Sequence, residues 1–130
     1  MNQKQPREPG QSPNAGWPFE EFQESELEQS VPHRFEQQVA RYPDRPAAQG
    51  ERYRFTYQQL NATANRIARA ILEQRGPGEE PVCILLENDA LAVAAMLGIL
   101  KAGKIYVVLD PAVPRDRLAY FALDSAAELI

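Results

Sequence analysis

The sequence predicts an α/β fold built on a parallel sheet. Residues 82–86 and 105–109 are continuous apolar runs, a pattern typical of strands buried on both faces. Helical patterns follow both runs, and residues 128–130 are interpreted as the start of a third strand. Strands that alternate with helices favour crossover connections between parallel strands. We therefore expect the order β–α–β–α–β, in a sheet still incomplete at residue 130.

The N-terminal residues 1–29 predict a flexible leader ahead of a domain spanning residues 30–130. Proline and glycine recur in the leader, and most other positions are glutamine, glutamate, asparagine or serine. Such a segment has too little apolar surface to offset the entropy of ordering it. Trp17, Phe19 and Phe22 are the exceptions, and two interpretations remain open. They dock on a neighbouring surface, as aromatic anchors do, or they are loose aromatic residues of a tail.

The domain is expected to open with a helix whose first turn contains Pro32, because proline is well tolerated in a first helical turn. Val31, Phe35 and Val39 recur every fourth residue and share one helical face. The proline after Tyr42 disfavours a helical conformation at the residue before it. The helix is therefore predicted to end near Tyr42.

A small hairpin and a second helix follow. Residues 47–48 and 53–55 flank Gly50-Glu51 and are interpreted as two short paired strands. Thr56 and Gln59 have the spacing of a capping box at a helix start. The apolar positions after them lie on one face of a helix that stops near a glycine; these residues are Leu60, Ala64, Ile67, Ile71 and Gly76.

The third helix is predicted over residues 89–102, with Asn88 as its N-cap and Asp89 near its positive end. Gly103 stands where a left-handed residue ends a helix. The strand 105–109 that follows is expected to be buried.

A fourth helix is predicted after Asp110-Pro111, which ends that strand. Pro114 opens this helix, and Leu118, Phe121 and Ala122 are expected to point inward. The predicted sheet has open edges, and unpaired edges invite aggregation.

Composition excludes several classes of function. The net charge of −4 gives no reason to expect nucleic acid or anionic lipid as a partner. Cys83 is the only cysteine, which excludes an internal disulfide framework and a cysteine-rich zinc site. Residues 1–4 lack the apolar core of a secretory signal. The apolar stretch 90–100 is too short to span a bilayer. We expect a cytoplasmic protein without a membrane role.

Isolated polar residues are better explained by structure than by chemistry. His33 is the only histidine and falls in a first helical turn, where solvated or packing roles are commoner than catalysis. Cys83 lies within a predicted buried strand and behaves as a small apolar residue. Asp110 is more simply a strand end than a general base. Residues 87–89 are better explained as a helix cap than as a carboxylate pair, and 115–117 as a solvated helix start.

Phosphate-binding motifs are absent from the sequence. Ligands of open α/β sheets bind at the carboxyl ends of strands, and neither strand end here carries a glycine-rich turn. The segment Gly76-Pro77-Gly78 follows a helix, which is the wrong context for either common nucleotide motif. The residues therefore predict no catalytic, cofactor-binding or metal-ligating position.

Two long segments nevertheless resemble a known family. Residues 55–68 (FTYQQLNATANRIA) resemble the first core motif of adenylation domains from nonribosomal peptide synthetases, and residues 100–111 (LKAGKIYVVLDP) resemble the second. The flanking stretches 35–44 and 114–120 agree with the same family. The second motif favours the peptide-synthetase branch of the adenylate-forming superfamily over acyl-CoA synthetases and luciferases. Val108 departs from the family, which usually has proline there.

The resemblance implies a fold and a reaction. It implies the N-terminal portion of the large subdomain of an AMP-dependent synthetase/ligase. Family members use ATP and Mg²⁺ to form an aminoacyl adenylate, and then transfer the aminoacyl group to the phosphopantetheine thiol of a carrier domain. The groups that perform this chemistry belong to later motifs of the family: the phosphate loop, the adenine and ribose sites and the C-terminal lysine. We therefore expect a partial adenylation domain that is inactive alone.

Three functional hypotheses follow. The first is this partial domain, whose partners would be the remainder of the domain and carrier or condensation domains. The second is a non-catalytic α/β interaction module, suggested by the aromatic residues of the leader. The third is an independent nucleotide-binding domain of flavodoxin type, which the missing phosphate loop disfavours.

Overall fold

The structure is a computed structural model, in which residues 21–124 and 128–129 are described, with side chains as far as residue 120. Trp17, Phe19 and Ile130 lie outside the described residues, as do the side chains of Phe121 and Ala122. The elements follow one another in the order η1 (Glu24–Glu28), α1 (Val31–Arg41), β1 (Pro46–Gln49), β2 (Arg54–Thr56), α2 (Tyr57–Arg75), β3 (Pro81–Leu85), α3 (Ala90–Lys101), β4 (Ile105–Leu109), α4 (Arg115–Asp124) and β5 (Glu128–Leu129).

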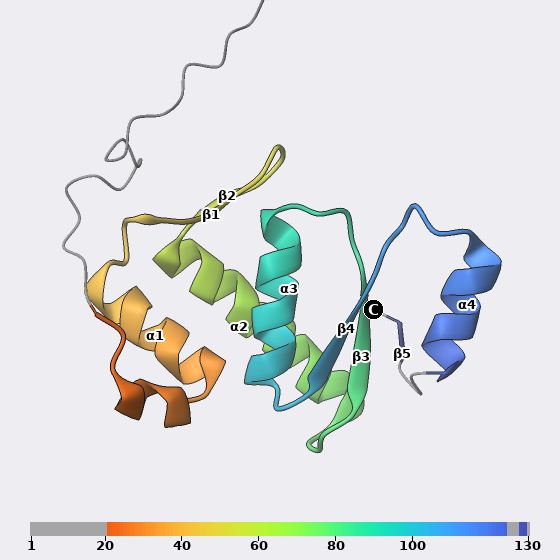
Figure 1. The fold of residues 1–130 in the computed structure, drawn as a ribbon, viewed down its shortest axis with the longest axis horizontal. Helices are drawn as coiled ribbons and strands as arrows, with labels where there is room; N and C mark the ends of the chain where they lie inside the picture. The colour runs from red at the N-terminus through yellow and green to blue at the C-terminus, as the bar shows by residue number, and fades with distance from the viewer. Residues whose placement is uncertain (1–20, 125–127, 130) are drawn as a thin grey trace, which may run out of the picture.

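The larger sheet is parallel and has the strand order β4-β3-β5. The chain therefore moves to one side of β3 after α3 and returns to the other side after α4. Figure 1 shows α2 and α3 on one side of this sheet and α4 on the opposite side. The predicted α/β class, the parallel pairing and the third strand are confirmed. The predicted hairpin is also confirmed, because β1 and β2 pair antiparallel.

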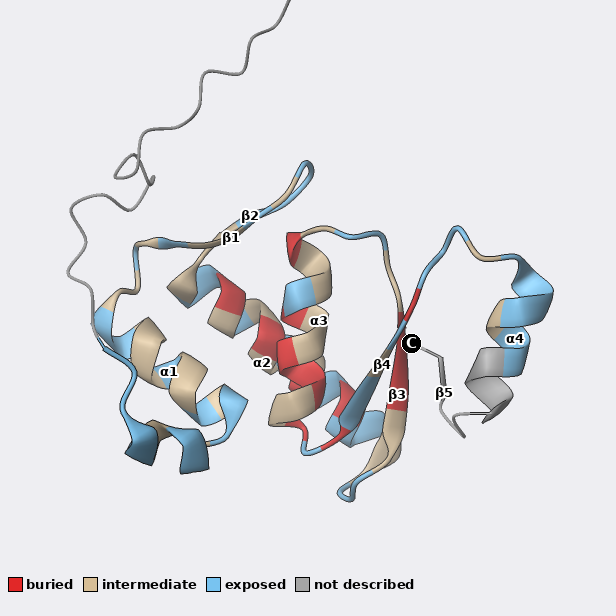
Figure 2. Ribbon diagram, viewed as in Figure 1, coloured by how far each residue is buried: buried red, intermediate tan, exposed pale blue. Residues whose placement is uncertain are grey.

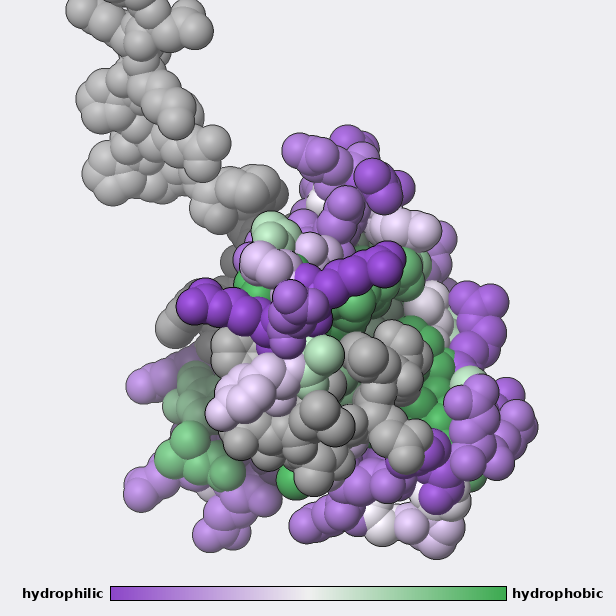
Figure 3. Space-filling view, turned by 90° about the vertical axis from the view of Figure 1, so that its right-hand side faces the viewer, coloured by the Kyte–Doolittle hydropathy of each residue, from purple (hydrophilic) through white to green (hydrophobic). Residues whose placement is uncertain are grey.

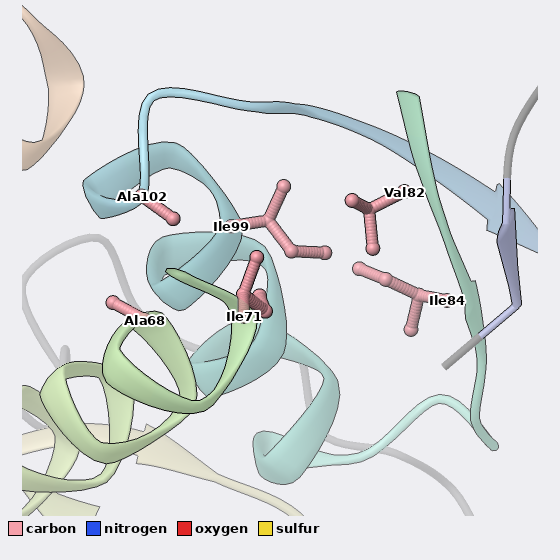
Figure 4. Close-up of a cluster of buried hydrophobic side chains, with 6 residues drawn as sticks. All are labelled: Ala68, Ile71, Val82, Ile84, Ile99 and Ala102. Carbon is pink, nitrogen blue, oxygen red and sulfur yellow. The ribbon is translucent and has the colours of Figure 1, made fainter. Parts of the chain in front are cut away.

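β3 is buried on both faces, as its apolar run predicts. Val82 and Ile84 point to the side covered by α2 and α3, and they pack there with Ile71 and Ile99 (Figure 4). Cys83 points to the other face, where Leu109 and the α4 side chain of Leu118 pack near it. Side chains of a strand alternate between its faces. A continuous apolar run therefore needs helices on both sides.

The prediction that β4 is buried is wrong. Ile105, Tyr106 and Val108 are exposed, and only Leu109 is fully buried (Figure 2). In the described residues β4 is the edge of the sheet, with a pairing partner on one side only. Figure 3 looks onto the α4 end of the molecule and shows apolar side chains, in green, open to solvent among polar ones.

The predicted helix starts are partly confirmed. Thr56 Oγ1 accepts a hydrogen bond from the Gln59 backbone at 3.2 Å, and Gln59 Oε1 accepts one from the Thr56 backbone at 3.0 Å. This is the predicted capping box of α2. Asn88 was expected to cap α3, but Asp89 is the cap instead. The Asp89 carboxylate takes this position because it also binds the backbone of the hairpin, a contact between segments far apart in the sequence.

The helices α2 and α3 cross closely. Gly98 lies at the crossing, where a Cβ atom would stand 2.7 Å from Cγ2 of Ile67 and 3.0 Å from the Ala64 carbonyl oxygen. Further along, Gly76 and Gly103 follow the two helices with φ of 70° and 74°. Both adopt left-handed conformations, which glycine tolerates best. The predicted glycine stops are confirmed.

The N-terminal elements pack beside α1. Residues 24–28, within the segment predicted to be a leader, form the 3₁₀ helix η1. Arg34 of α1 pairs with Glu26 of η1, and its guanidinium lies 5.4 Å from the ring centroid of Phe22. On α1 itself Phe35 and Val39 are half-buried, whereas Val31 is exposed.

Candidate functional site

The carboxyl ends of β3 and β4 border a pocket of the described structure. α3 and α4 follow these strand ends on opposite sides of the sheet (Figure 1). Ligands of α/β sheets commonly bind at this edge, and the pocket found here is called the crevice below. A pocket of about 410 Å³ lies here, between the tip of the hairpin and the β3–α3 loop. Its lining includes Arg52, Tyr53, Leu86, Glu87 and Pro111.

Asp89 joins the hairpin to α3 at this pocket. Its Oδ1 accepts a hydrogen bond from the Ala90 backbone at 2.6 Å, and its Oδ2 accepts one from the Arg52 backbone at 3.0 Å. Partial burial alone would raise the pKa of Asp89. Hydrogen bonds from the backbones of Ala90, Arg52 and Tyr53 outweigh burial, so this pKa lies below its ordinary value. Asp89 is therefore a charged structural clamp.

Gly50 allows the hairpin to approach this clamp. A Cβ atom on Gly50 would stand 1.7 Å from Oδ1 of Asp89 and 3.0 Å from the Ala90 backbone nitrogen. Only a residue without a side chain fits at that distance. The sequence predicted a turn at Gly50, but nothing in it indicated this contact with a residue thirty-nine positions later.

The crevice holds apolar walls and a charged rim, but no reactive pair. Arg52 and Glu87 form an exposed ion pair at 3.4 Å, a kind that contributes little to stability. In the described part of the chain, no three histidine, cysteine or acidic side chains gather where they could hold a metal ion. Of the described helices, none is long and apolar enough to cross a membrane.

The polar residues singled out in the sequence are dispersed. His33 is exposed in the first turn of α1, where its backbone donates to Ser30 Oγ at 3.3 Å. Cys83 is fully buried in β3. Asp110 is exposed, and its Oδ1 accepts from the Ala112 backbone at 2.9 Å, which confirms its role in a turn. Residues 115–117 are exposed at the start of α4. Only Glu87 and Asp89 meet at one pocket.

A buried lysine was missed by the sequence analysis. The Lys104 side chain is completely buried, and its Nζ lies 2.8 Å from the Gly78 carbonyl oxygen and 3.0 Å from Oε1 of Glu80. The parallel register pairs Pro81 with Ile105, so the residues just before them are neighbours. The signal that could have indicated this pair is an acidic residue and a basic residue, each directly before one of two adjacent parallel strands.

Comparisons with known proteins agree on one family. A sequence profile of the AMP-binding enzyme family matches residues 35–130. Bacitracin synthase 1 of Bacillus licheniformis is 41% identical over 96 residues, which cover 74% of this chain. The match covers only 2% of that much longer protein.

Solved structures match in the same region. The nonribosomal peptide synthetase FmoA3, in a form bound to α-methyl-L-serine-AMP, superposes with a TM-score of 0.72 and 32% identity over 75% of this chain and 11% of its own. The N-terminal subdomain of NpsA from Klebsiella oxytoca has a TM-score of 0.71 over 78% of this chain and 27% of its own. Its 23% identity shows the fold alone. The chain therefore belongs to the AMP-binding enzyme family, in which it matches the N-terminal portion of adenylation domains from nonribosomal peptide synthetases.

Proposed function

We propose that residues 30–130 serve as the front portion of an amino-acid-activating adenylation domain and are catalytically inactive alone. The complete domain would form an aminoacyl adenylate from ATP and pass the aminoacyl group to a carrier domain. The observation that carries this proposal is the family match over residues 35–130, joined to the small share of each relative that the chain covers.

The chemistry of the described residues supports inactivity of the isolated chain. Nucleotidyl transfer depends on donors and metal ions placed around the phosphates. The crevice at the carboxyl ends of β3 and β4 offers apolar walls and one exposed ion pair instead. His33, Cys83 and Asp110 lie in separate places and touch no common pocket among those described.

The exposed strand β4 supports a role as part of a larger unit. A parallel strand is normally covered on both faces, yet Ile105 and Val108 are exposed to solvent. The remainder of an adenylation domain is the proposed cover, and carrier or condensation domains are the proposed further partners. We place the assembly in the cytoplasm, where the reduced thiol of Cys83 is an ordinary buried residue.

A pyrophosphate-exchange assay on the isolated chain tests the first half of this proposal. The chain is incubated with ATP, Mg²⁺ and each amino acid in turn, and we expect exchange at the background rate. Exchange well above background with any amino acid would overturn the proposal, because the residues present would then suffice for catalysis.

A chimera tests the second half. Residues 30–130 of this chain replace the corresponding segment of FmoA3, the relative whose structure contains α-methyl-L-serine-AMP. We expect the chimera to support exchange that depends on α-methyl-L-serine. His33→Ala and Asp110→Asn in the chimera should keep kcat/KM within about twofold, since neither residue is assigned to the chemistry.

A folding control completes the design. Ile99→Asp places a charge in the core beside Val82 and Ile84 and should abolish exchange together with the folded state. A chimera that folds with a cooperative melt but shows no exchange would contradict the assignment of these residues as an adenylation-domain front.

A further inference from the structure

Another pocket lies at the opposite end of α3 from the crevice, where residues of α1, α2 and α3 meet (Figure 1). Its volume is about 590 Å³. Lys101, Arg69 and Glu36 contribute charges to its lining, and Leu72 and Leu100 contribute apolar surface. No residue of this lining also lines the crevice. We call it the α1–α2–α3 pocket.

Lys101 places a buried positive charge at the α1–α2–α3 pocket. Its side chain is only 7% exposed, and its ammonium group pairs with the Glu36 carboxylate. An ammonium group can donate three hydrogen bonds, yet Glu36 is the one hydrogen-bond partner that Lys101 has among the described residues. A buried charge needs hydrogen bonds to its remaining protons as well as an opposite charge. Lys101 can therefore bind a further oxyanion at this pocket.

Glu36 is a replaceable partner of that ammonium group. Its side chain is 53% exposed on α1, and water competes well for a carboxylate in such a position. Among the described residues, the contact with Lys101 is the one ion pair that is lost when Glu36 turns toward solvent. The Glu36 carboxylate therefore marks a position that the oxyanion of a ligand can take.

The helix ends at the pocket have opposite effects on an anion. Ser30, the N-cap of α1, lines the pocket, and the positive end of a helix favours anions. Lys101 lies in the last turn of α3, whose negative end disfavours them. The carbonyl oxygens of residues 98–100 accept hydrogen bonds from the backbone of residues 102–104, which reduces this second effect. The two cationic side chains therefore decide the sign of the charge at the pocket.

We propose that the α1–α2–α3 pocket binds a small organic phosphate, whose phosphate group contacts Lys101 and Arg69 and whose apolar body lies against Leu72. With Glu36 turned outward, the two cations supply two positive charges, and a phosphate monoester carries about −1.5 to −2 at pH 7. Lysine and arginine are the usual partners of phosphate oxygens. This proposal is independent of the proposed function.

Binding of phenyl phosphate to the full chain tests the proposal. Saturation-transfer NMR on its ring protons gives the Kd, and inorganic phosphate and benzoate are compared by displacement. We expect saturable binding of phenyl phosphate that is tighter than binding of either competitor. Absence of saturable binding up to about 10 mM would overturn the proposal. Inorganic phosphate or benzoate binding as tightly as phenyl phosphate would overturn the assigned ligand class.

Glu36→Gln distinguishes a ligand site from a purely structural ion pair. It removes the competing carboxylate and keeps an acceptor for Lys101, so phenyl phosphate should bind at least about threefold more tightly. Glu73→Gln is the control, because Glu73 is exposed on α2 outside the pocket. It should change the Kd by less than about twofold. Unchanged or weaker binding to the Glu36→Gln chain would refute the replacement of Glu36 by the ligand.

Arg69→Gln tests the second cation on the protein surface, where the fold does not depend on it. Arg69 and Arg66 are both exposed on α2, and of the two only Arg69 lines the pocket. Arg69→Gln should raise the Kd for phenyl phosphate about tenfold, because a hydrogen bond to a charged group is lost. Arg66→Gln should change it by less than about twofold. Equal effects of the two substitutions would assign binding to net charge alone and overturn the proposal.

Discussion

Lys104 shows how one buried charge is accommodated by its neighbours. Its Nζ is held by the Gly78 carbonyl and by Glu80, and Glu80 also contacts Arg75 at 3.4 Å. The hydrogen bond from Lys104 is the largest influence on the pKa of Glu80; burial opposes it and the charge of Arg75 reinforces it. The pKa of Glu80 is therefore below its ordinary value. These contacts fix the loop between α2 and β3.

A pH dependence of stability follows from Glu80. A carboxyl whose pKa is lowered by folding contributes stability above its unfolded pKa, and this contribution disappears as pH falls through the folded value. The native chain should therefore lose stability as pH falls below the ordinary pKa of a glutamate and through the lowered pKa of Glu80 in the folded state. Glu80→Gln should flatten this loss, as measured by the denaturant midpoint against pH.

Glu79→Gln removes an exposed carboxylate from the adjacent position and serves as the control. It should keep the acid-induced loss seen in the native chain. A Glu80→Gln profile that is parallel to the native profile would show that the ion pair with Lys104 contributes nothing below neutral pH.

Gly50 is a second residue whose role depends on a distant contact. Gly50→Ala should lower the free energy of unfolding by about 1–2 kcal/mol, because its Cβ would overlap the Asp89 carboxylate. A double-mutant cycle with Asp89→Ala measures the coupling by denaturant unfolding. The alanine at position 50 should cost much less when the carboxylate is absent, and additive effects of the two substitutions would refute this explanation.

At the scale of elements, the pair α2 and α3 organises the core. Ala64 and Ala94 are fully buried and small, and Gly98 has no side chain, so the two helices approach closely. The apolar residues of α2 and α3 then meet β3 as one continuous cluster (Figure 4). The spacing of these small residues decides the distance between the helices.

Gly98→Ala tests this packing. In an exposed helix, replacing glycine with alanine stabilises by about 1 kcal/mol. At this crossing the added methyl group meets Ile67 at 2.7 Å, and overpacking of this kind costs about 1–3 kcal/mol. We therefore expect a net loss of unfolding free energy and a lower Tm. In an Ile67→Ala background, Gly98→Ala should cost less unfolding free energy than it does in the native chain. A Gly98→Ala variant more stable than the native chain would disprove the close crossing.

At the scale of the whole molecule, the sheet is covered unevenly. α2 and α3 protect one face of β3, and α4 packs on the other, while β4 stays exposed (Figure 2). Exposed edge strands with apolar side chains pair readily with other chains. The isolated chain should therefore self-associate through β4.

Val108→Lys tests this self-association. Val108 is 54% exposed on β4, and a lysine there discourages edge pairing. Burial of a valine side chain in an interface contributes about 1.5 kcal/mol. The loss of this contribution corresponds to a roughly tenfold weaker association. Sedimentation velocity over a range of concentrations should show this shift. Leu72→Lys on α2 is the control and should leave association unchanged; equal association of all three proteins would exclude β4 as the interface.

The same substitution should affect a different property, the thermal stability, in the proposed complete domain. In the FmoA3 chimera, Val108 would be covered, so Val108→Lys should lower the Tm. If Val108→Lys leaves the Tm of the chimera unchanged, β4 is not covered in the chimera, and the proposed cover is contradicted.

Local signals in the sequence determined the element types and the family. Thr56 and Gln59 form their capping box from neighbours in the chain, and Gly76 and Gly103 stop their helices through their own backbone freedom. The apolar run around Cys83 determined a strand buried on both faces, and residues 55–68 and 100–111 carried the resemblance to adenylation domains. Each of these features depends on residues close together in sequence, which is why they could be predicted.

Contacts between distant segments were decided only by the tertiary structure. Asp89, and not the predicted Asn88, caps α3. The hairpin lies over the strand ends and supplies hydrogen bonds to the Asp89 carboxylate. The strand 105–109 looks as apolar as β3, yet it is exposed because its position at the edge depends on which strands lie beside it. The charge of Lys104 is buried because the parallel register brings Glu80 next to it. The sequence by itself specified the elements, whereas their neighbours in space decided which side chains are buried, paired or exposed.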